Sequence, residues 1–166
     1  MQPDASTDTP EISSATVHRS ARAADHALIY STWLSSMKES MVETRGRSPD
    51  AAVRVAPDVF YAGQHRRIER LLSDPATRIL LCALVADLDV ALGWAIARGD
   101  CLHYVFVKPA WRRRGIARGL VQTLANGRFN RYSVHTRPGD SFVVPMMPGA
   151  VYDPFAVDTE SAHDGA

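Results

Sequence analysis

The spacing of hydrophobic positions changes several times along the chain, and each change marks a predicted element. Strands are predicted at 15–19, 78–86, 90–98, 101–107 and 131–136, where short apolar or β-branched runs lie between turn residues. Helices are predicted from the Asp25 cap to Met41, from Pro57 to Ser73 and from Ile116 up to Gly127, where apolar residues recur every three to four positions. A last short strand is predicted near Val151 and Tyr152.

In chain order, the pattern predicts a strand, two helices, three strands, a helix, a strand and an irregular end rich in proline and glycine. This order is typical of a single α/β domain in which helices and strands are mixed. Residues 1–14 and 157–166 are polar and have little to bury, so they are predicted to be a disordered leader and tail around a domain at 15–156.

Composition narrows the class of protein further. The 166 residues are 46% hydrophobic and carry a net charge of +1, which argues against a general polyanion binder. The longest apolar run, 79–86, is far shorter than the roughly 20 residues of a membrane-spanning helix. Cys82 and Cys101 lie among apolar neighbours without metal-ligand spacing, so we expect reduced core cysteines and no metal site. These features predict a cytoplasmic protein that is not bound to a membrane.

The most informative segment for chemistry is 105–121, VFVKPAWRRRGIARGLV. It reads as a strand, a turn bearing arginine and glycine, and the start of an amphipathic helix. The first backbone N–H groups of a helix have no partner within it, and the helix dipole adds partial positive charge there. Such a turn suits a phosphate or pyrophosphate. A solvated basic helix start, with a glycine needed only for packing, explains the same residues equally well.

This segment resembles the acetyl-CoA-binding motif of the GNAT superfamily of N-acetyltransferases, commonly written Q/R-x-x-G-x-G/A. Arg112, Gly115 and Ala117 fill the motif, and Val107, Pro109 and Trp111 match its usual lead-in. Upstream, VHRSARAADHALIYSTW resembles the opening strand and helix of the family. A looser likeness, through LHYVFVK and the closing VYDPF, is to small acetyltransferase-like proteins encoded in bacteriophage genomes.

The resemblance implies a central, mostly antiparallel twisted sheet with helices on both faces. Two of its strands, 101–107 and 131–136, would splay apart and admit the pantetheine arm of acetyl-CoA. Backbone groups of Val105, Phe106 and Val107 would bind that arm and polarise the thioester carbonyl. The pyrophosphate would lie on the turn and helix start, at Arg112, Arg113, Arg114, Gly115, Ile116, Ala117 and Arg118. The implied reaction is direct attack by a primary amine in a ternary complex.

This reaction needs a base, because a primary amine is mostly protonated at neutral pH. Strand alternation places His103 on the same face as Val105 and Val107, and serotonin N-acetyltransferase is similar in carrying a histidine at the matching position. A buried, hydrogen-bonded structural histidine is the competing interpretation. The acid in this family is often a tyrosine on a helix after the second splayed strand. That helix is not predicted here, so Tyr152 is the nearest candidate, and Tyr132 is expected to pack.

Other positions have weaker signals. Trp33, Met37 and Met41 form a helical stripe expected in the core, although the family places its first helices beside the acceptor, which makes Tyr30, Trp33 and 45–50 candidate contacts. A charged face formed by His65, Arg66, Arg67 and Arg70 is expected to be solvated. His135 is predicted either to face the cleft or to be structural.

The sequence therefore predicts one of two functions, an enzymatic one or a non-catalytic one. The first is an acetyl-CoA-dependent N-acetyltransferase acting on a small amine or a protein amine. The alternative is a GNAT-shaped domain that binds CoA or a macromolecule without turnover. Contact between Arg112, Arg113, Arg114 and nucleic-acid phosphates is disfavoured by the near-neutral charge and the lack of interleaved exposed aromatic residues.

Overall fold

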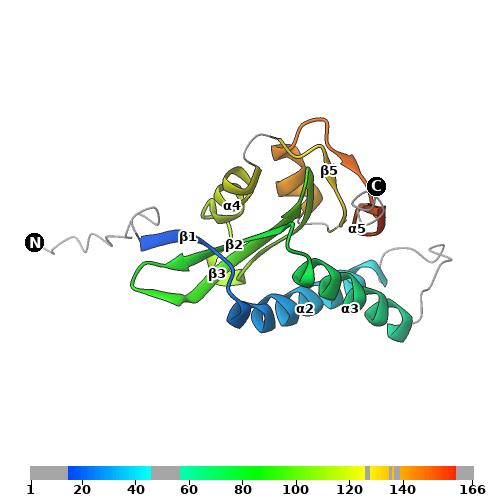
Figure 1. Ribbon diagram of the computed structural model, residues 1–166, viewed down its shortest axis with the longest axis horizontal. Helices are drawn as coiled ribbons and strands as arrows, with labels where there is room; N and C mark the ends of the chain where they lie inside the picture. Colours follow the sequence, from blue (N-terminus) through cyan, green and yellow to red (C-terminus); the bar gives the residue numbers. More distant parts are fainter. Residues whose placement is uncertain (1–14, 46–56, 126–127, 135, 137–138, 160–166) are drawn as a thin grey trace, which may run out of the picture.

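A computed structural model of the chain describes residues 15–45, 57–125, 128–134, 136 and 139–159. Its centre is one six-stranded sheet in the order β1-β2-β3-β4-β5-β6 (Figure 1). The strands are β1 (Thr16–Ser20), β2 (Thr77–Leu84), β3 (Asp87–Arg98), β4 (Cys101–Val107), β5 (Arg131–Tyr132) and β6 (Val151–Tyr152). The first four strands pair antiparallel, whereas β4–β5 and β5–β6 are parallel. The predicted mixed fold with a mostly antiparallel sheet is confirmed.

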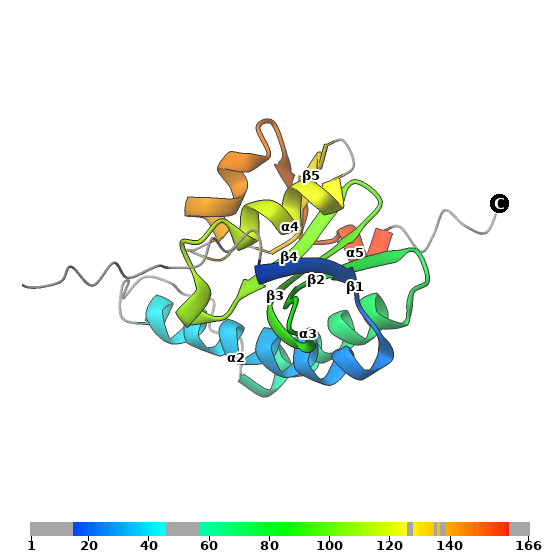
Figure 2. The same cartoon turned by 90° about the vertical axis from the view of Figure 1, so that its left-hand side faces the viewer.

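Helices cover both faces of this sheet. The long helices α2 (His26–Arg45) and α3 (Pro57–Ser73) lie on one face, and α4 (Ile116–Ala125) lies on the other (Figures 1 and 2). A short helix, α5 (Ala156–Thr159), packs against α3. None of the helices in the described part of the chain has the length and apolar character needed to cross a membrane.

The face under α2 and α3 holds an aromatic core. Ile29, Trp33 and Met37 recur four residues apart on α2, so they share one side of the helix and are all buried. The Trp33 ring stacks on Tyr104 of β4 with 4.8 Å between centroids and lies 5.6 Å from the ring of Trp94 on β3. The expected core roles of Trp33 and Met37 are confirmed, while the side chain of Met41 lies outside the described residues.

The face under α4 holds a second, aliphatic core. Four buried residues of this helix pack on the sheet, namely Ile116, Leu120, Val121 and Leu124. They meet Leu92 and Ala95 of β3 and Leu102 of β4. Because α4 follows β4 through a short turn, its first residue is held close to the end of that strand.

The segment after β5 differs from the sequence-based prediction. Instead of a strand over 131–136, pairing ends at Tyr132, and the later chain forms a π-helical turn η3 (Gly139–Val143) and a 3-10 turn η4 (Val144–Met146). Both turns lie on the α4 side of the sheet, where Val143 and Met146 pack against the aliphatic core (Figure 2). Single turns leave too few repeats for a helical period to show in the sequence.

The ends of the chain are described only in part. The boundary predicted between 156 and 157 falls inside α5, where Val157 is 5% exposed and belongs to the core under α2 and α3. The predicted leader at 1–14, the candidate acceptor contacts at 46–50 and the rest of the predicted tail at 160–166 lie outside the described residues, and so does His135.

Candidate functional site

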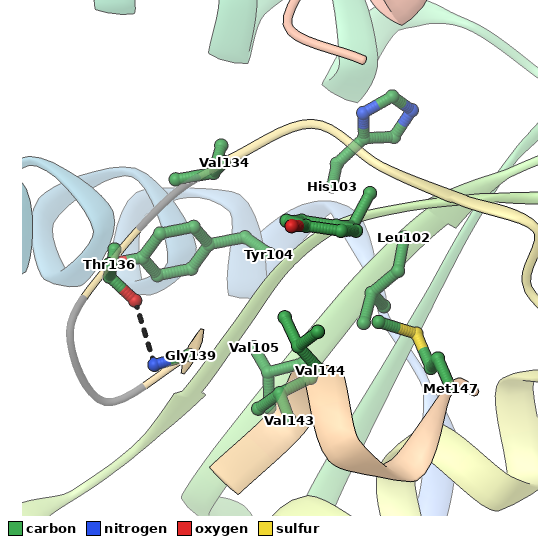
Figure 3. A pocket seen from close by; sticks show the side chains of 11 residues that line it. Leu102, His103, Tyr104, Val105, Val134, Thr136, Gly139, Val143, Val144 and Met147 are labelled. Atoms are coloured by element: carbon green, nitrogen blue, oxygen red, sulfur yellow. Dashed lines mark hydrogen bonds between the residues drawn. The ribbon is translucent and has the colours of Figure 1, made fainter. Parts of the chain in front are cut away.

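A pocket opens where β4 and the chain after β5 separate. The two strands pair only at Cys101↔Arg131 and Leu102↔Tyr132, after which Ser133 N–H donates to the Leu102 carbonyl at 3.1 Å. Beyond that bond the pocket is lined by Tyr104 and Val105 on one side, by Val134 and Thr136 on the other, and by Val143 and Val144 of η3 and η4 (Figure 3). The predicted separation between β4 and the chain that follows β5 is therefore present, and the residues that line it are mostly apolar.

A β-bulge in β4 lies at the start of this separation. In the β3–β4 register, Ile96 pairs with Tyr104 and Ala97 with Leu102, so His103 is an extra residue without a partner on β3. A bulge bends its strand and increases the local twist. The bulge therefore turns the end of β4 away from β5 at the residue where pairing stops.

The bulge also changes which face His103 occupies. Leu102 and Val105 both pack on the α4 side, while Tyr104 packs under α2. The ring of His103 points away from Val105 and toward α3 (Figure 3). The predicted shared face of His103, Val105 and Val107 is wrong, because regular alternation does not continue through a bulge.

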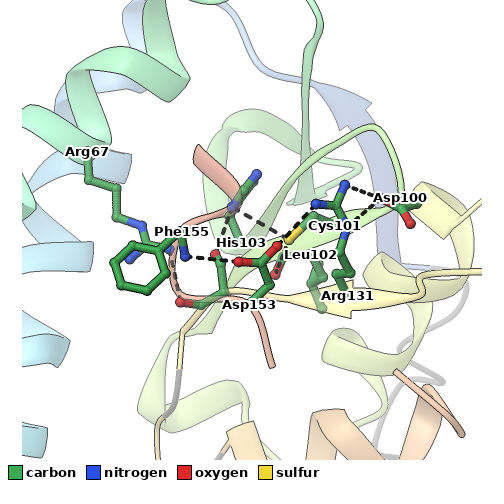
Figure 4. Close-up of polar contacts among 9 residues, drawn as sticks. Arg67, Asp100, Cys101, Leu102, His103, Arg131, Asp153 and Phe155 are labelled. Atoms are coloured by element: carbon green, nitrogen blue, oxygen red, sulfur yellow. Dashed lines mark hydrogen bonds and ion pairs between the residues drawn. The ribbon is translucent and has the colours of Figure 1, made fainter. Parts of the chain in front are cut away.

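His103 is held in a polar cluster on the α3 side. Its Nδ1 lies 2.7 Å from Ser133 Oγ and 4.0 Å from Cys101 Sγ (Figure 4). Arg67 of α3 also contacts Ser133, because its guanidinium donates to the Ser133 carbonyl at 2.9 Å. The side chain of His103 is 1% exposed, and its Nε2 is buried without a hydrogen-bond partner among the described residues.

This environment makes His103 a weak base. Burial, followed by the charges of Arg67, Arg98 and Arg131, lowers the pKa of His103 to about 3. The ring is therefore neutral at pH 7, and it accepts a proton far less readily than a free imidazole. The pKa of about 3 and the contact with Ser133 favour the structural interpretation of His103. His103 also lines the pocket, and its role as a general base stays a prediction.

Two of the arginines around His103 are paired with carboxylates. Arg131 contacts Asp100 at 2.6 Å and Asp153 at 3.2 Å, and Arg98 contacts Asp74 at 2.8 Å. The hydrogen bond from Arg131 lowers the pKa of Asp100, so this carboxylate remains ionised and joins the β3–β4 turn to β5. Asp100 is therefore a structural ion-pair residue.

The turn before α4 has the geometry expected of an anion site. Arg113 and Gly115 have φ values of 63° and 80°, and a Cβ placed on Gly115 would meet nothing within 4 Å. The first backbone bond into α4 runs from Gly119 N–H to the Gly115 carbonyl at 2.9 Å. Among the described residues, the preceding amides of Ile116, Ala117 and Arg118 have no backbone acceptor, so they are available to an anion.

The arginines of this turn are all exposed but differ in their contacts. Arg112 Nε donates to the Val107 carbonyl at 3.2 Å, which ties the turn to the end of β4. The Arg114 guanidinium lies over the Trp111 ring, 5.0 Å from its centroid. Among the described residues, the side chains of Arg113 and Arg118 form neither a hydrogen bond nor a cation–π contact. The structure thus places the residues predicted to hold a cofactor, from Val105 to Arg118, along one continuous path from the strand gap to the helix start.

The remaining predicted residues fall elsewhere. Tyr152 lies on β6, beyond β5 from the gap, where its ring packs 5.5 Å from that of Tyr132 and its side chain does not line the pocket. Tyr30 packs edge-on against His65 of α3, with 5.0 Å between ring centroids. The expected solvated face of α3 is wrong for Arg67, which turns toward the sheet.

Sequence reasoning missed Ser133, Gln64 and the inward position of Arg67. A signal for Arg67 does exist, because it lies three residues after Gln64 and four before the buried Leu71, on the inner side of α3. Ser133 carries no such signal, since its role depends on the bulge in a neighbouring strand.

Comparison with solved structures identifies the fold. A GCN5-related N-acetyltransferase from Rhodopseudomonas palustris is 15% identical and superposes with a TM-score of 0.51, covering 79% of this chain and 80% of that chain. The chain has the GNAT fold. An aminoglycoside acetyltransferase from an uncultured soil metagenomic sample, solved in complex with sisomicin, is 16% identical with a TM-score of 0.47, covering 86% of this chain and 94% of its own. No protein-family model and no curated protein sequence matches the chain.

In this fold, β4 connects the gap between the separated strands to the turn before α4. The mostly antiparallel sheet, the separation of β4 from the chain after β5 and the helices on both faces agree with the architecture that the resemblance implied. The parallel β5–β6 pair and the turns η3 and η4 replace the helix that the family often carries after its second splayed strand.

Proposed function

We propose that this protein transfers the acetyl group of acetyl-CoA to a primary amine. The observation that carries the proposal is the continuity of two features within the GNAT fold. The gap between β4 and the chain after β5 leads, through residues 105–107, directly to a turn with free amides and an open Gly115. A long ligand with an apolar arm and a pyrophosphate at its end fits both features at once.

The fit to acetyl-CoA can be followed residue by residue. The amides of Ile116, Ala117 and Arg118 would hold the pyrophosphate, with Arg113 and Arg118 adding charge. Backbone groups of Val105, Phe106 and Val107 would bind the pantetheine arm, because β4 has no described strand beside it beyond Leu102 on the β5 side. Bound acetyl-CoA supplies a thioester that an amine can attack.

In this proposal the protein contributes to the reaction mainly by positioning acetyl-CoA and the amine. Holding the donor in the gap and the amine beside it converts a bimolecular step into an oriented one. A β4 N–H near Val105 or Phe106 would stabilise the negative charge that develops on the carbonyl oxygen. Because His103 has a pKa of about 3 and Tyr152 lies outside the pocket, this proposal has the amine lose its proton to water.

The first test is acetyl-CoA binding by calorimetry in a matched pair of variants. Wild type should bind with about 4–8 kcal/mol. Gly115→Glu should abolish this binding, because the new carboxylate lies where the pyrophosphate is expected. Gly149→Glu is the control, since Gly149 has a similar φ of 86° and open space around it but lies in another turn. Both variants place a side chain at a positive φ in open space, so the comparison isolates the location of the new carboxylate.

The second test is turnover, followed as CoA release with a panel of small amines and a lysine-containing peptide. Absence of both binding heat and a thermal shift with saturating acetyl-CoA would refute the proposal. Normal binding by Gly115→Glu would place the pyrophosphate elsewhere. Tight binding without acetylation of any amine would favour the non-catalytic alternative, a GNAT-shaped CoA-binding protein.

A further inference from the structure

Of five buried side-chain polar atoms that lack hydrogen-bond partners among the described residues, three lie on α3 or on the β4 bulge. They are Gln64 Oε1 and Arg67 Nε, which lie one turn apart on α3, and His103 Nε2 on the β4 bulge. Arg67 and His103 meet at Ser133, which accepts from Arg67 through its carbonyl and contacts His103 through its hydroxyl. Buried polar groups in folded proteins are nearly always paired, so this side of the strand gap has bonding capacity that the described chain does not use.

Arg67 differs from the other two arginines near His103. Arg98 and Arg131 each pair with carboxylates, whereas Arg67 forms no ion pair with any described carboxylate. Asp153 and Asp158 influence it only at longer range, and burial lowers the pKa of its guanidinium. An unpaired charge removed from water is costly, and an anion from outside the chain would relieve that cost. Arg67 is only partly buried, so part of its side chain is exposed to solvent.

We propose that Arg67 binds a carboxylate of the acceptor, so that the protein acetylates amines that also carry a carboxylate. This inference rests on the proposed function and names its substrate class. The guanidinium fork is suited to a planar carboxylate, which can accept two N–H groups at once. Val143 and Val144 lie on the α4 side of β4 (Figure 3), whereas Arg67 and His103 lie on the α3 side (Figure 4), where both contact Ser133. Donor and acceptor therefore approach the gap from opposite faces.

The charge of Arg67 also orients such an acceptor. Arg98 and Arg131 are neutralised by their carboxylate partners, so the charge that attracts an anion and repels an ammonium group on this side is that of Arg67. The carboxylate end lies at Arg67, and the amine end is directed away from it, toward the gap beside Val105. An acceptor without an anionic group has no partner for Arg67 and binds more weakly.

The experiment compares matched acceptors that differ only in the carboxylate. The probes are glycine, β-alanine, 4-aminobutanoate and 6-aminohexanoate, each beside its carboxamide, and kcat/KM is measured for each pair. Wild type should prefer the acid by about 10- to 100-fold for at least one chain length, mainly through KM. A phosphoethanolamine and ethanolamine pair tests phosphate as the anion instead.

Three variants locate the preference. Arg67→Gln should bring the acid-to-amide ratio close to one, and Arg67→Lys should retain part of the preference through its charge. Arg66→Gln is the matched control, because Arg66 is the neighbouring arginine of α3 and is exposed. It should keep the wild-type ratio. Acetyl-CoA binding by each variant shows that it is folded, and if Arg67→Gln does not fold, the Arg67→Lys ratio decides.

The outcomes separate this inference from the proposed function. Equal kcat/KM for acids and amides, or a preference confined to phosphoethanolamine, overturns the carboxylate site while acetyl transfer stands. If no amine is acetylated, the proposed function fails, and calorimetry with 4-acetamidobutanoate and its amide tests the site directly. Binding of the acid alone, lost in Arg67→Gln, then supports the site, and absence of binding overturns it.

Discussion

His103 shows how the surroundings of one residue decide its chemistry. An imidazole titrates near neutral pH in water, which makes any strand histidine a candidate base. Here the ring is buried beside three arginines, and its pKa falls to about 3. The same side chain contacts Ser133 at 2.7 Å, the first residue after β5. This contact joins β4 to the chain directly after β5, where the two begin to separate.

This environment predicts a stability that depends on pH. The pKa of His103 is lowered on folding, so the unfolded chain, with a pKa near 6.5, takes up the proton first as the pH falls. The free energy of unfolding should therefore fall below about pH 6.5 and continue to fall toward about pH 3, by up to about 1.4 kcal/mol per pH unit. Burial also lowers the pKa of His18, which adds to the loss in the same direction. Urea unfolding at pH 7, 6, 5 and 4 measures this slope.

Two substitutions assign the slope to His103. His103→Gln should flatten it, because glutamine cannot take up the proton. His65→Gln, a change on α3 at the Tyr30 contact, should leave the slope as in wild type. Parallel curves for wild type and His103→Gln would show that His103 is not the titrating group.

At the scale of elements, strand β3 allows β4 and α4 to approach one another closely. Gly93 pairs with Val107, and a Cβ at this position would lie 2.6 Å from the Phe106 carbonyl and 3.3 Å from the side chain of Ile116. The missing side chain therefore lets the end of β4 and the start of α4 pack on β3 together. Those are the two elements from which the proposed acetyl-CoA site is built.

Gly93→Ala should consequently affect both stability and binding. The added methyl group forces β3 and β4 apart, and we expect a loss of about 1–3 kcal/mol in the free energy of unfolding. Acetyl-CoA affinity should fall as well, because Phe106 and Val107 must shift. Gly63→Ala is the control, since it lies on α3 in open space and should stabilise the helix by about 0.5–1 kcal/mol. Unchanged unfolding and affinity for Gly93→Ala would contradict the tight packing.

At the scale of the whole molecule, the sheet lies between two cores, one under α2 and α3 and the other under α4. The gap between β4 and the chain after β5 interrupts this sheet. The core under α2 and α3 extends to α5, where Ala156 is fully buried and Val157 is 5% exposed. The chain after β6 thus returns to pack beside α3, the helix that carries Arg67. Residues near the end of the described chain contribute to the same core as Trp33 and Trp94.

A pair of substitutions near the end of the described chain tests this arrangement. Val157→Ser should lower the free energy of unfolding by about 1.5–3 kcal/mol, because it removes buried apolar surface. Phe155→Ser, two residues earlier and 66% exposed, should change it by less than about 0.5 kcal/mol. Chemical denaturation of both variants decides the matter. Equal effects would mean that α5 does not belong to the core.

Much of the fold follows from local spacing in the sequence. The stripe of Ile29, Trp33 and Met37 predicts α2, and Pro75 ends the predicted α3, because periodicity and backbone breakers act within a few residues. The turn at Gly115 was also predicted, because it lies between the apolar strand pattern that ends at Val107 and the helical spacing that begins at Ile116. These features needed no knowledge of distant parts of the chain.

Tertiary structure alone decided the rest, because it depends on pairing between distant segments. The face of His103 follows from a bulge in the β3–β4 register, and the short β5 follows from the divergence that this bulge begins. Arg67 becomes an unpaired, partly buried cation only because α3 packs over Ser133, 66 residues further along the chain. The resemblance to the GNAT motif predicted the proposed acetyl-CoA site, whereas the proposed acceptor side of the gap depends on how α3 and the chain after β5 meet in space.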